Sequence, residues 1–136
     1  MEEQSLPLFE IGHPGVQREA LLRNILIGAK TATSYPLEED NPEVLKAQVG
    51  ELQMLIDSNN KPVAVVRITE VLITELSNVD ESVAHDEGEG FIGVDDWRQV
   101  HEAHWLGEAY DSKFIGWQMP DNTKIVVERF KLESIG

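Results

Sequence analysis

Residues 62–74 read Pro-Val-Ala-Val-Val-Arg-Ile-Thr-Glu-Val-Leu-Ile-Thr, a long run with apolar side chains at both sets of alternating positions. As a strand, it would carry two apolar faces: Val63, Val65, Val71 and Ile73 on one, and Ala64, Val66, Ile68 and Leu72 on the other. Such a strand needs cover on both sides, so we expect it at the centre of a sheet or in a covered barrel. Arg67 and Thr69 interrupt the first face, as side chains beside a polar cleft would.

A hairpin joins this run to a shorter strand before it. That strand begins at Gly50, and its apolar residues alternate with polar neighbours: Leu52, Met54 and Ile56. Residues 57–60, Asp-Ser-Asn-Asn, provide the turn, because asparagine tolerates the left-handed backbone conformation.

The first third of the chain predicts one helix. From Val16 the apolar residues recur at helical spacing, and Gly28 is placed to end the helix in a left-handed cap. Pro14 suits the first helical position, where its missing N–H group costs nothing. Residues 31–35 read as a short extended segment, residues 36–42 as a loop, and residues 43–47 as a candidate short helix.

The second half of the chain predicts two helices and a last strand. Asn78 or Asp80 would cap a short helix that ends at Ala84, and a loop over residues 86–90 follows. One face of the next helix collects Val94, Trp97, His101, His104, Trp105 and Glu108. A strand over residues 123–132 ends the chain. This order indicates a single α+β domain over residues 1–136, with residues 1–13 as an N-terminal tail. Its small, mostly antiparallel sheet would curl into a barrel flanked by helices.

Composition narrows the classes of function. The 136 residues include no cysteine, which excludes disulfides and thiolate chemistry and suits a cytoplasmic protein. The start of the chain lacks a signal-peptide pattern, and no apolar run is long enough to cross a membrane. Eleven basic residues stand against 25 acidic ones, for a net charge of −14, with no basic run. Long duplex nucleic acid is therefore disfavoured as a partner, whereas a nucleoside, a short single-stranded RNA or a small uncharged ligand is not.

The segment Gly28-Ala-Lys-Thr-Ala-Thr33 has two interpretations. In the first, it is a capping glycine, a solvated lysine and β-forming threonines. In the second, the end of the helix places Lys30 in a cleft, where a desolvated amine acts as a base towards the Thr33 hydroxyl. Side chains three residues apart lie on opposite faces of a regular strand, so the second interpretation needs a bend between them.

The loop Glu87-Gly-Glu-Gly90 also has more than one interpretation. Acidic loops with glycine are commonly solvated turns. Two carboxylates that follow a helix, with glycines that allow close backbone approach, also suit a general acid or an acceptor for a substrate amine. Calcium is a third option, but the ligand pattern of an EF-hand is missing.

His101 and His104 are one residue closer together than the helical zinc motif requires. We expect these imidazoles to pack beside Trp97 and Trp105, and we expect the two indoles in the core rather than in a base-stacking platform. The sequence has no glycine-rich phosphate cradle and no nucleophile elbow, and it predicts neither a metal nor a cofactor.

Taken together, four motifs resemble the ASCH domain, a family similar in fold to PUA domains. They are Gly28-x-Lys30-x-x-Thr33, the long strand that ends near Val71, Ala84-x-x-Glu87-Gly-Glu-Gly90 and Trp97-Arg-x-x-His101. Their order and spacing span nearly the whole chain and are most similar to the longer bacterial branch. The family is associated with RNA binding, some short members are amidohydrolases acting on N4-acetylcytidine, and another branch is linked to ribonuclease activity.

The resemblance implies roles for particular residues. Lys30 would be the base, Thr33 the nucleophile, and Glu87 the donor of a proton to the departing amine, with its pKa raised by burial or by Glu89. The family motif often continues Thr-x-Arg, and this chain has Tyr35 where that arginine would stand. The substrate-binding positions are then Gly28, Tyr35, Arg67, Glu89 and Arg98. Either Arg67 or Arg98 replaces the family arginine, or the substrate differs from that of the family. The alternatives to an amidohydrolase are a non-catalytic RNA-binding module and a ribonuclease.

Overall fold

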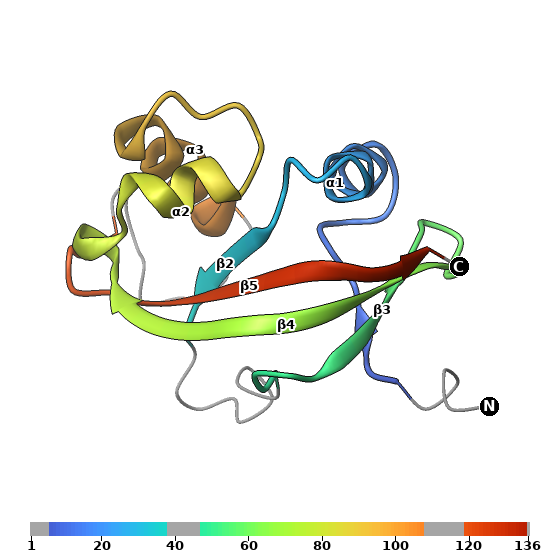
Figure 1. Ribbon diagram of the computed structural model, residues 1–136. Coiled ribbons are helices and arrows are strands. Elements are labelled where there is room, and N and C mark those ends of the chain that lie inside the picture. Colours follow the sequence, from blue (N-terminus) through green and yellow to red (C-terminus); the bar gives the residue numbers. More distant parts are fainter. Residues whose placement is uncertain (1–5, 38–46, 108–118, 136) are drawn as a thin grey trace.

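The computed structural model describes residues 6–37, 47–107 and 119–135. Their centre is a five-stranded sheet in the order β1-β3-β4-β5-β2 (Figure 1). The strands are β1 (Leu8–Phe9), β2 (Ala32–Pro36), β3 (Leu52–Ile56), β4 (Pro62–Glu75) and β5 (Lys124–Ile135). Every pairing is antiparallel except that of β1 with β3. The predicted α+β class with a mostly antiparallel sheet is confirmed.

The long apolar run is the central strand, as its pattern predicts. β4 pairs with β3 on one side and with β5 on the other. Two register shifts, at Val65/Val66 and at Ile68/Glu70, break its regular alternation, so its two apolar sets do not keep to two fixed faces. Ile73 and Leu72 are 44% and 41% exposed, so the described residues do not cover the last part of the strand.

The hairpin and the first helix are also found where the sequence predicts them. Asn60 has a φ of 65° in the turn between β3 and β4. Helix α1 (Val16–Leu26) buries Leu22 and Ile25, and Gly28 follows it with a φ of 85°, as expected of a glycine after a helix end. Pro14 lies before the helix rather than at its first position, because Gly15 is the residue that precedes Val16.

The expected N-terminal tail is wrong for the part that the structure describes. Leu8 and Phe9 pair in parallel with Met54 and Leu55 of β3. Phe9 and Ile11 are buried, and the Phe9 ring meets Phe130 edge-on, with 5.2 Å between the ring centroids. A strand of two residues gives no alternation to detect, so local sequence carries no signal for it.

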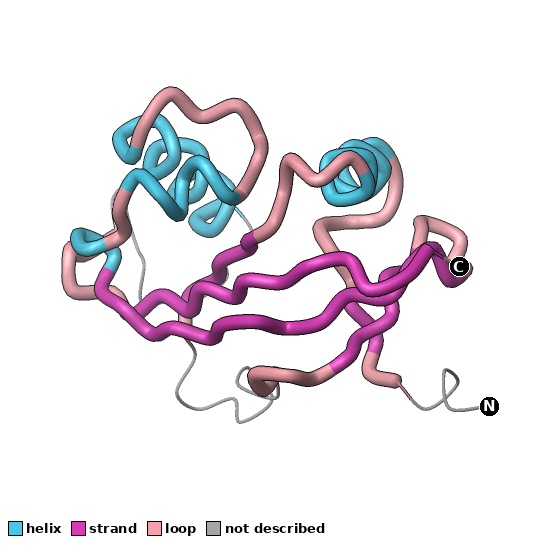
Figure 2. Tube along the Cα trace, in the orientation of Figure 1, coloured by secondary structure: helices cyan, strands magenta, loops and turns pink. Residues whose placement is uncertain are grey.

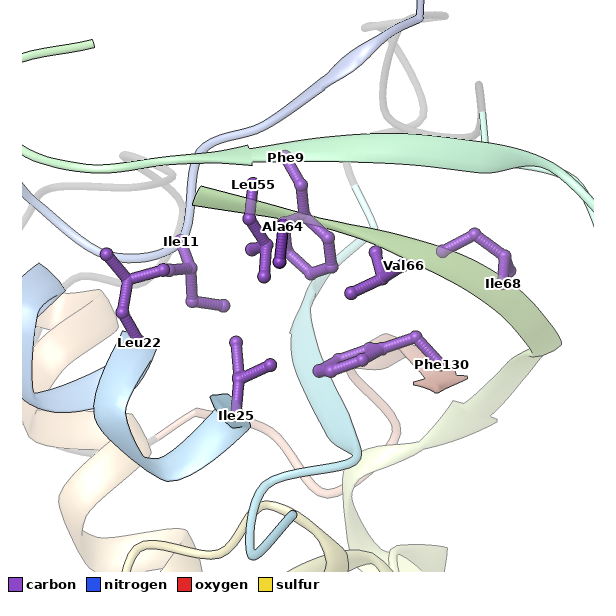
Figure 3. Packing of buried hydrophobic residues seen from close by; sticks show 9 residues of the cluster. All are labelled: Phe9, Ile11, Leu22, Ile25, Leu55, Ala64, Val66, Ile68 and Phe130. Carbon is purple, nitrogen blue, oxygen red and sulfur yellow. The ribbon is translucent and has the colours of Figure 1, made fainter. Parts of the chain in front are cut away.

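The helices form two groups at the two ends of the β4–β5 ribbon (Figure 1). Helix α1 lies near the C-terminal end of β5, where it packs over a cluster that includes Phe9, Ile25 and Phe130 (Figure 3). Near the other end lie α2 (Glu81–Asp86), which Asp80 caps through the Val83 N–H group, and α3 (Val94–Gly107). A short 3-10 turn, η3 (Leu76–Asn78), connects β4 to this second group, and Figure 2 shows it and the loops between the elements.

Two expectations about the fold are not confirmed: the closed barrel and the short helix over residues 43–47. Among the described strands, β1 and β2 are the edges of the sheet and do not pair with each other, so closure into a barrel is not confirmed. The candidate helix over residues 43–47 and the position of Glu108 lie outside the described residues, except for Ala47. In the described ranges, no helix combines the length and the apolar character that a membrane span requires.

Candidate functional site

Lys30 lies between α1 and β2, with 2% of its surface exposed. Its ammonium group donates to the backbone oxygens of Ala32 (2.9 Å) and Glu87 (3.2 Å) and to Glu89 Oε2 (3.0 Å). Three acceptors match the three N–H bonds of an ammonium ion. The described arrangement is therefore that of a buried cation, not of a free amine.

Gly88 allows the loop after α2 to reach Lys30. Its φ is +65°, and a Cβ atom at this position would lie 2.2 Å from the carbonyl oxygen of Ala29. Beside this contact, the Thr31 N–H group donates to the Asp86 oxygen at 2.7 Å. Two loops meet here: the lysine loop, which carries Ala29 and Lys30, and the glutamate loop, which carries Glu87 and Gly88. A side chain at Gly88 would force them apart, so they meet only because this residue is glycine.

Glu87 is 1% exposed and is surrounded by hydrogen-bond donors. Its Oε2 atom accepts from the Ser34 hydroxyl at 2.5 Å and from Trp97 Nε1 at 2.9 Å. Its Oε1 atom lies 3.0 Å from His101 Nε2 and 3.9 Å from Lys30 Nζ. Helix α3 supplies two of these partners, which explains why the Trp-Arg-x-x-His motif follows the glutamate loop.

These neighbours set the ionisation of Glu87. Burial favours its neutral form, but the hydrogen bond and charge of His101, the charge of Lys30 and the hydrogen bond from Ser34 outweigh burial. The pKa of Glu87 is therefore lowered. The expectation of a raised pKa is wrong for the unliganded protein, because burial acts together with donors that stabilise the carboxylate.

Both ring nitrogens of His101 have hydrogen-bond partners. Its Nδ1 atom lies 2.8 Å from the Trp97 carbonyl oxygen, which can only accept, so Nδ1 carries a proton. Its Nε2 atom donates to Glu87 when the ring is cationic, and accepts from Glu87 when that residue is the protonated partner. The ring is held in place by stacking on Trp97, with 4.4 Å between centroids, and by an edge contact with Trp105. His101 thus packs beside both indoles, as predicted. Its contact with Glu87 was not predicted.

Thr33 and Ser34 are neighbours in β2 and therefore point to opposite faces of the sheet. Ser34 is buried and faces Glu87, whereas Thr33 lies opposite Glu128 in the register of β2 with β5. Among the described residues the Thr33 hydroxyl makes no hydrogen bond, so it is not bonded to Lys30 in the unliganded protein. Catalytic hydrogen bonds often form only once a substrate is bound.

Tyr35 and Glu128 form a second polar pair near Thr33. The Tyr35 hydroxyl donates to Glu128 Oε2 at 2.5 Å. Burial, and to a smaller extent the charge of Glu51, raise the pKa of Glu128, although the hydrogen bond from Tyr35 opposes the shift. The Glu128 carboxyl group is therefore closer to its acid form than an exposed glutamate is.

A cleft of about 430 Å³ lies between the two helical groups, and several of the residues described above line it. Lys30, Thr33, Tyr35, Glu87 and Glu89 all line it. Its other lining residues come from β1 and the segment after it, from α1, from β2, from α3 and from β5: Phe9, Glu10, Ile11, Gly12, His13, Gln17, Leu21, Ser34, Val100, His101, Trp105 and Glu128.

The other predicted substrate-binding residues do not line this cleft. Gly28 is exposed after α1 and serves the helix end. Arg67 bonds Glu133 at 3.0 and 3.1 Å across the β4–β5 pair. Arg98 pairs with Glu102 and Asp121 and lines a separate surface cleft. Neither arginine replaces, at this cleft, the arginine for which Tyr35 stands.

Besides the contact of His101 with Glu87, sequence reasoning missed three parts of the site. The sequence placed Ser34 in an extended segment without a role. Neighbouring residues in a strand point to opposite faces, and this was the available signal that Ser34 and Thr33 face different sides of the sheet. The indole N–H of Trp97 contacts Glu87, which a core assignment did not anticipate. Glu128 lies in the last strand with no motif around it, and only the register of β5 with β2 brings it to the cleft. In the described residues, no group of three or more His, Asp or Glu side chains is arranged to hold a metal ion.

The described residues thus form an α+β domain in which the loop that carries Lys30 meets the loop that carries Glu87 beside a mostly antiparallel sheet. The model of the ASCH domain matches residues 10–134, and the chain belongs to the ASCH domain family. No curated protein matches the sequence.

Two solved structures share the fold of this chain. One is protein EF3133 from Enterococcus faecalis V583, with 23% identity over 96% of this chain and 76% of that chain, at a TM-score of 0.74. The other is an ASCH domain from Lactobacillus crispatus JV V101, with 23% identity over 96% of this chain and 83% of that chain, at a TM-score of 0.75. At this level of identity, the likeness concerns the fold alone.

Proposed function

We propose that this protein is an amidohydrolase that removes the acyl group from a small N-acylated nucleoside such as N4-acetylcytidine. The observation that supports this proposal best is the shared cleft. Lys30, Thr33 and Glu87, to which the family resemblance gives the roles of base, nucleophile and proton donor, all line it. Lys30 and Glu87 are also buried, which is unusual for charged residues without a special role.

The charge of the cleft favours a neutral ligand over a phosphate. Its described lining carries the carboxyl groups of Glu10, Glu87, Glu89 and Glu128, and Lys30 is the one lysine or arginine among them. A nucleic-acid backbone needs cationic contacts, and so does the charged transition state of phosphoryl transfer. An RNA-binding module and a ribonuclease therefore have less support than hydrolysis of an uncharged amide.

The proposed chemistry needs a Lys30 amine and a protonated Glu87. The described arrangement differs from this pair by the position of a single proton. Nζ of Lys30 and Oε1 of Glu87 are 3.9 Å apart, so the two atoms must approach to hydrogen-bond distance before that proton passes from Lys30 to Glu87. A neutral substrate that displaces water from the cleft lowers the local polarity and favours the uncharged pair over the ion pair. The low pKa of Glu87 in the unliganded protein is thus compatible with its role as an acid once the substrate is bound.

The reaction then balances in two steps. The Lys30 amine accepts the hydroxyl proton of Thr33 while the Thr33 oxygen attacks the acyl carbonyl carbon. The C–N bond breaks, and Glu87 gives its proton to the departing amine nitrogen. Water next attacks the Thr33 ester and passes a proton to Glu87, while the Thr33 oxygen leaves with the proton that Lys30 holds. The carboxylic acid is released, and both groups return to their uncharged forms.

Cytidine release from N4-acetylcytidine tests the proposal. We expect turnover by the parent protein and a loss of roughly 100-fold or more in Lys30→Ala, Thr33→Ala and Glu87→Gln, because proton transfer and nucleophilic attack each contribute at least that much. Thermal melting of each variant separates loss of chemistry from loss of fold. Release by the parent protein no faster than by Lys30→Ala would overturn the proposal for this substrate.

Ser34 provides the matched control for the nucleophile. It carries a hydroxyl group next to Thr33 in the chain, but on the other face of β2. We expect mass spectrometry of a quenched reaction to find the acyl group on Thr33, in Ser34→Ala as well as in the parent protein. Turnover that survives Thr33→Ala but disappears in Ser34→Ala would show that the nucleophile is wrongly assigned.

A further inference from the structure

Arg129 of β5 does not line the cleft, but it contacts the helix that leads to Glu87. Its Nε atom donates to Asp86 Oδ2 at 3.1 Å, and its Nη2 atom donates to the Ser82 hydroxyl at 3.2 Å, both in α2. Its Nη1 atom donates to Glu70 Oε1 of β4 at 2.5 Å. Because a guanidinium group holds its donors in a fixed planar fork, these three bonds set α2 against the β4–β5 pair.

The register of the sheet directs Arg129 towards α2. Arg129 is the direct partner of Ala32 in β2, so it shares a face of the sheet with Ala32 and with Ser34, which contacts Glu87. A register shift in β4 brings Glu70 opposite Arg129. Bulges re-aim side chains in this way. The guanidinium group therefore has an acceptor on the sheet as well as acceptors on the helix.

Helix α2 depends on such contacts for its position. It has six residues, and an isolated helix of that length is not stable in water. Its last residue, Asp86, is held at two points: the carboxylate by Arg129, and the backbone oxygen by the Thr31 N–H group at 2.7 Å. Glu87 follows Asp86 directly in the chain. The position of the Glu87 carboxyl group relative to Lys30 therefore depends on how firmly Asp86 is held.

We propose that Arg129 is a positioning residue for Glu87, and that it acts by fixing the end of α2 rather than by contact with the substrate. This inference rests on the proposed function and adds a residue that lies outside the four sequence motifs. The Arg129 side chain is 22% exposed, and its partners Glu70 and Asp86 are 49% and 32% exposed. Ion pairs as exposed as these add little to stability. A small displacement of a reacting group, in contrast, lowers turnover by a large factor.

Proton NMR of the Trp97 indole tests the positioning without turnover. The Trp97 Nε1–H group donates to Glu87 Oε2, so its resonance, which is absent from Trp97→Phe, reports where that carboxylate lies. In Arg129→Met, whose side chain cannot donate, we expect this resonance to shift and its proton to exchange with solvent roughly tenfold faster or more. Arg67→Met is the matched control, because Arg67 pairs with Glu133 across the same two strands, and it should leave the resonance in place.

Turnover of N4-acetylcytidine separates positioning from loss of fold. We expect Arg129→Ala to lower kcat by roughly tenfold or more and to keep KM within about threefold of the parent value, because Arg129 lies outside the cleft. Guanidinium chloride, far below the concentration that unfolds the protein, should restore part of this kcat, since the free ion can bind the same three acceptors. Potassium chloride at the same ionic strength is the control. A protein that is merely destabilised would lose activity in guanidinium.

Two results would overturn this inference. The first is a Trp97 resonance that Arg129→Met leaves in place. The second is a kcat of Arg129→Ala that stays within twofold of the parent, or that falls only with the folded fraction and is not restored by guanidinium, which would mean that Arg129 only stabilises the fold. If the parent protein does not hydrolyse N4-acetylcytidine, the proposed function fails for that substrate, and the NMR comparison still decides whether Arg129 positions Glu87.

Discussion

At the scale of single residues, the site depends on one place where two loops meet. Gly88 lets the glutamate loop lie against the backbone of Ala29 and Lys30, and the Lys30 ammonium then bonds the Glu87 carbonyl oxygen. Glu87 is in turn held by donors from β2 and α3. A small backbone feature therefore positions the groups to which we assign the chemistry.

Gly88→Ala should cost more stability than an ordinary left-handed glycine. The positive φ alone costs an alanine about 1–2 kcal/mol, and here its Cβ would also overlap the Ala29 carbonyl oxygen. Gly28→Ala is the matched control, because Gly28 has a φ of +85° but nothing within 4 Å of a Cβ. Urea unfolding should show a clearly larger loss for Gly88→Ala than for Gly28→Ala. Equal losses would mean that the loop contact adds nothing.

Glu87 and Glu128 should affect stability with opposite dependence on pH. The folded-state pKa of Glu87 is lowered, so its contribution is complete above the unfolded-state pKa of about 4.3 and is lost as the pH falls through the folded-state value. The folded-state pKa of Glu128 is raised, so its contribution is complete below about pH 4.3 and is lost as the pH rises through the folded-state value.

Urea unfolding between about pH 3.5 and pH 8 checks this pair of signs. Glu87→Gln should be destabilised by about 3–5 kcal/mol at neutral pH, as expected when one partner of a buried ion pair is removed, and by less at the acid end. Glu128→Gln should gain stability relative to the parent as the pH rises. A deficit in Glu87→Gln that grows towards acid pH, or a Glu128→Gln curve parallel to the parent, would contradict these assignments.

At the scale of elements, sequence reasoning succeeded where the signal is local. The central strand, the hairpin turn and the glycine after α1 each follow from a period or from a left-handed residue, both of which a short window contains. The pairing of β1 and the approach of Glu128 to Thr33 depend on register between segments far apart in the chain. Motif order brought Lys30 and Glu87 together, but it could not show that Ser34 rather than Thr33 touches Glu87.

β1 provides a direct test of the corrected N-terminus. Phe9 is buried against Phe130, so Phe9→Ala should cost about 3–5 kcal/mol, the usual loss for a buried aromatic ring. Leu8, its neighbour in the same strand, is 56% exposed, and Leu8→Ala should change stability by about 0.5 kcal/mol or less. Denaturant unfolding of the two variants compares them in the same element. A negligible effect of Phe9→Ala on stability would contradict this assignment and indicate that the segment is a tail.

At the scale of the whole molecule, the net charge of the chain and the carboxyl groups of the cleft both disfavour an anionic ligand. The chain carries a net charge of −14, and the cleft adds several carboxyl groups around one buried lysine. The long-range field and the local lining therefore both repel anions, and both leave an uncharged nucleoside unaffected. This agreement is the physical basis for preferring a nucleoside to a nucleotide or an RNA chain as the ligand.

The 5′-monophosphate of N4-acetylcytidine should therefore be a poorer substrate than the nucleoside. At low ionic strength, we expect its KM to be several-fold higher, because the phosphate approaches a negatively charged protein and finds Lys30 already paired with Glu89. Added salt screens the repulsion between exposed charges, so the gap should narrow towards 1 M salt, where the screening length is about 3 Å. The nucleoside KM is the control and should change little over the same range. A phosphate that lowers KM, with an advantage that salt removes, would instead indicate a site for nucleotides or single-stranded RNA.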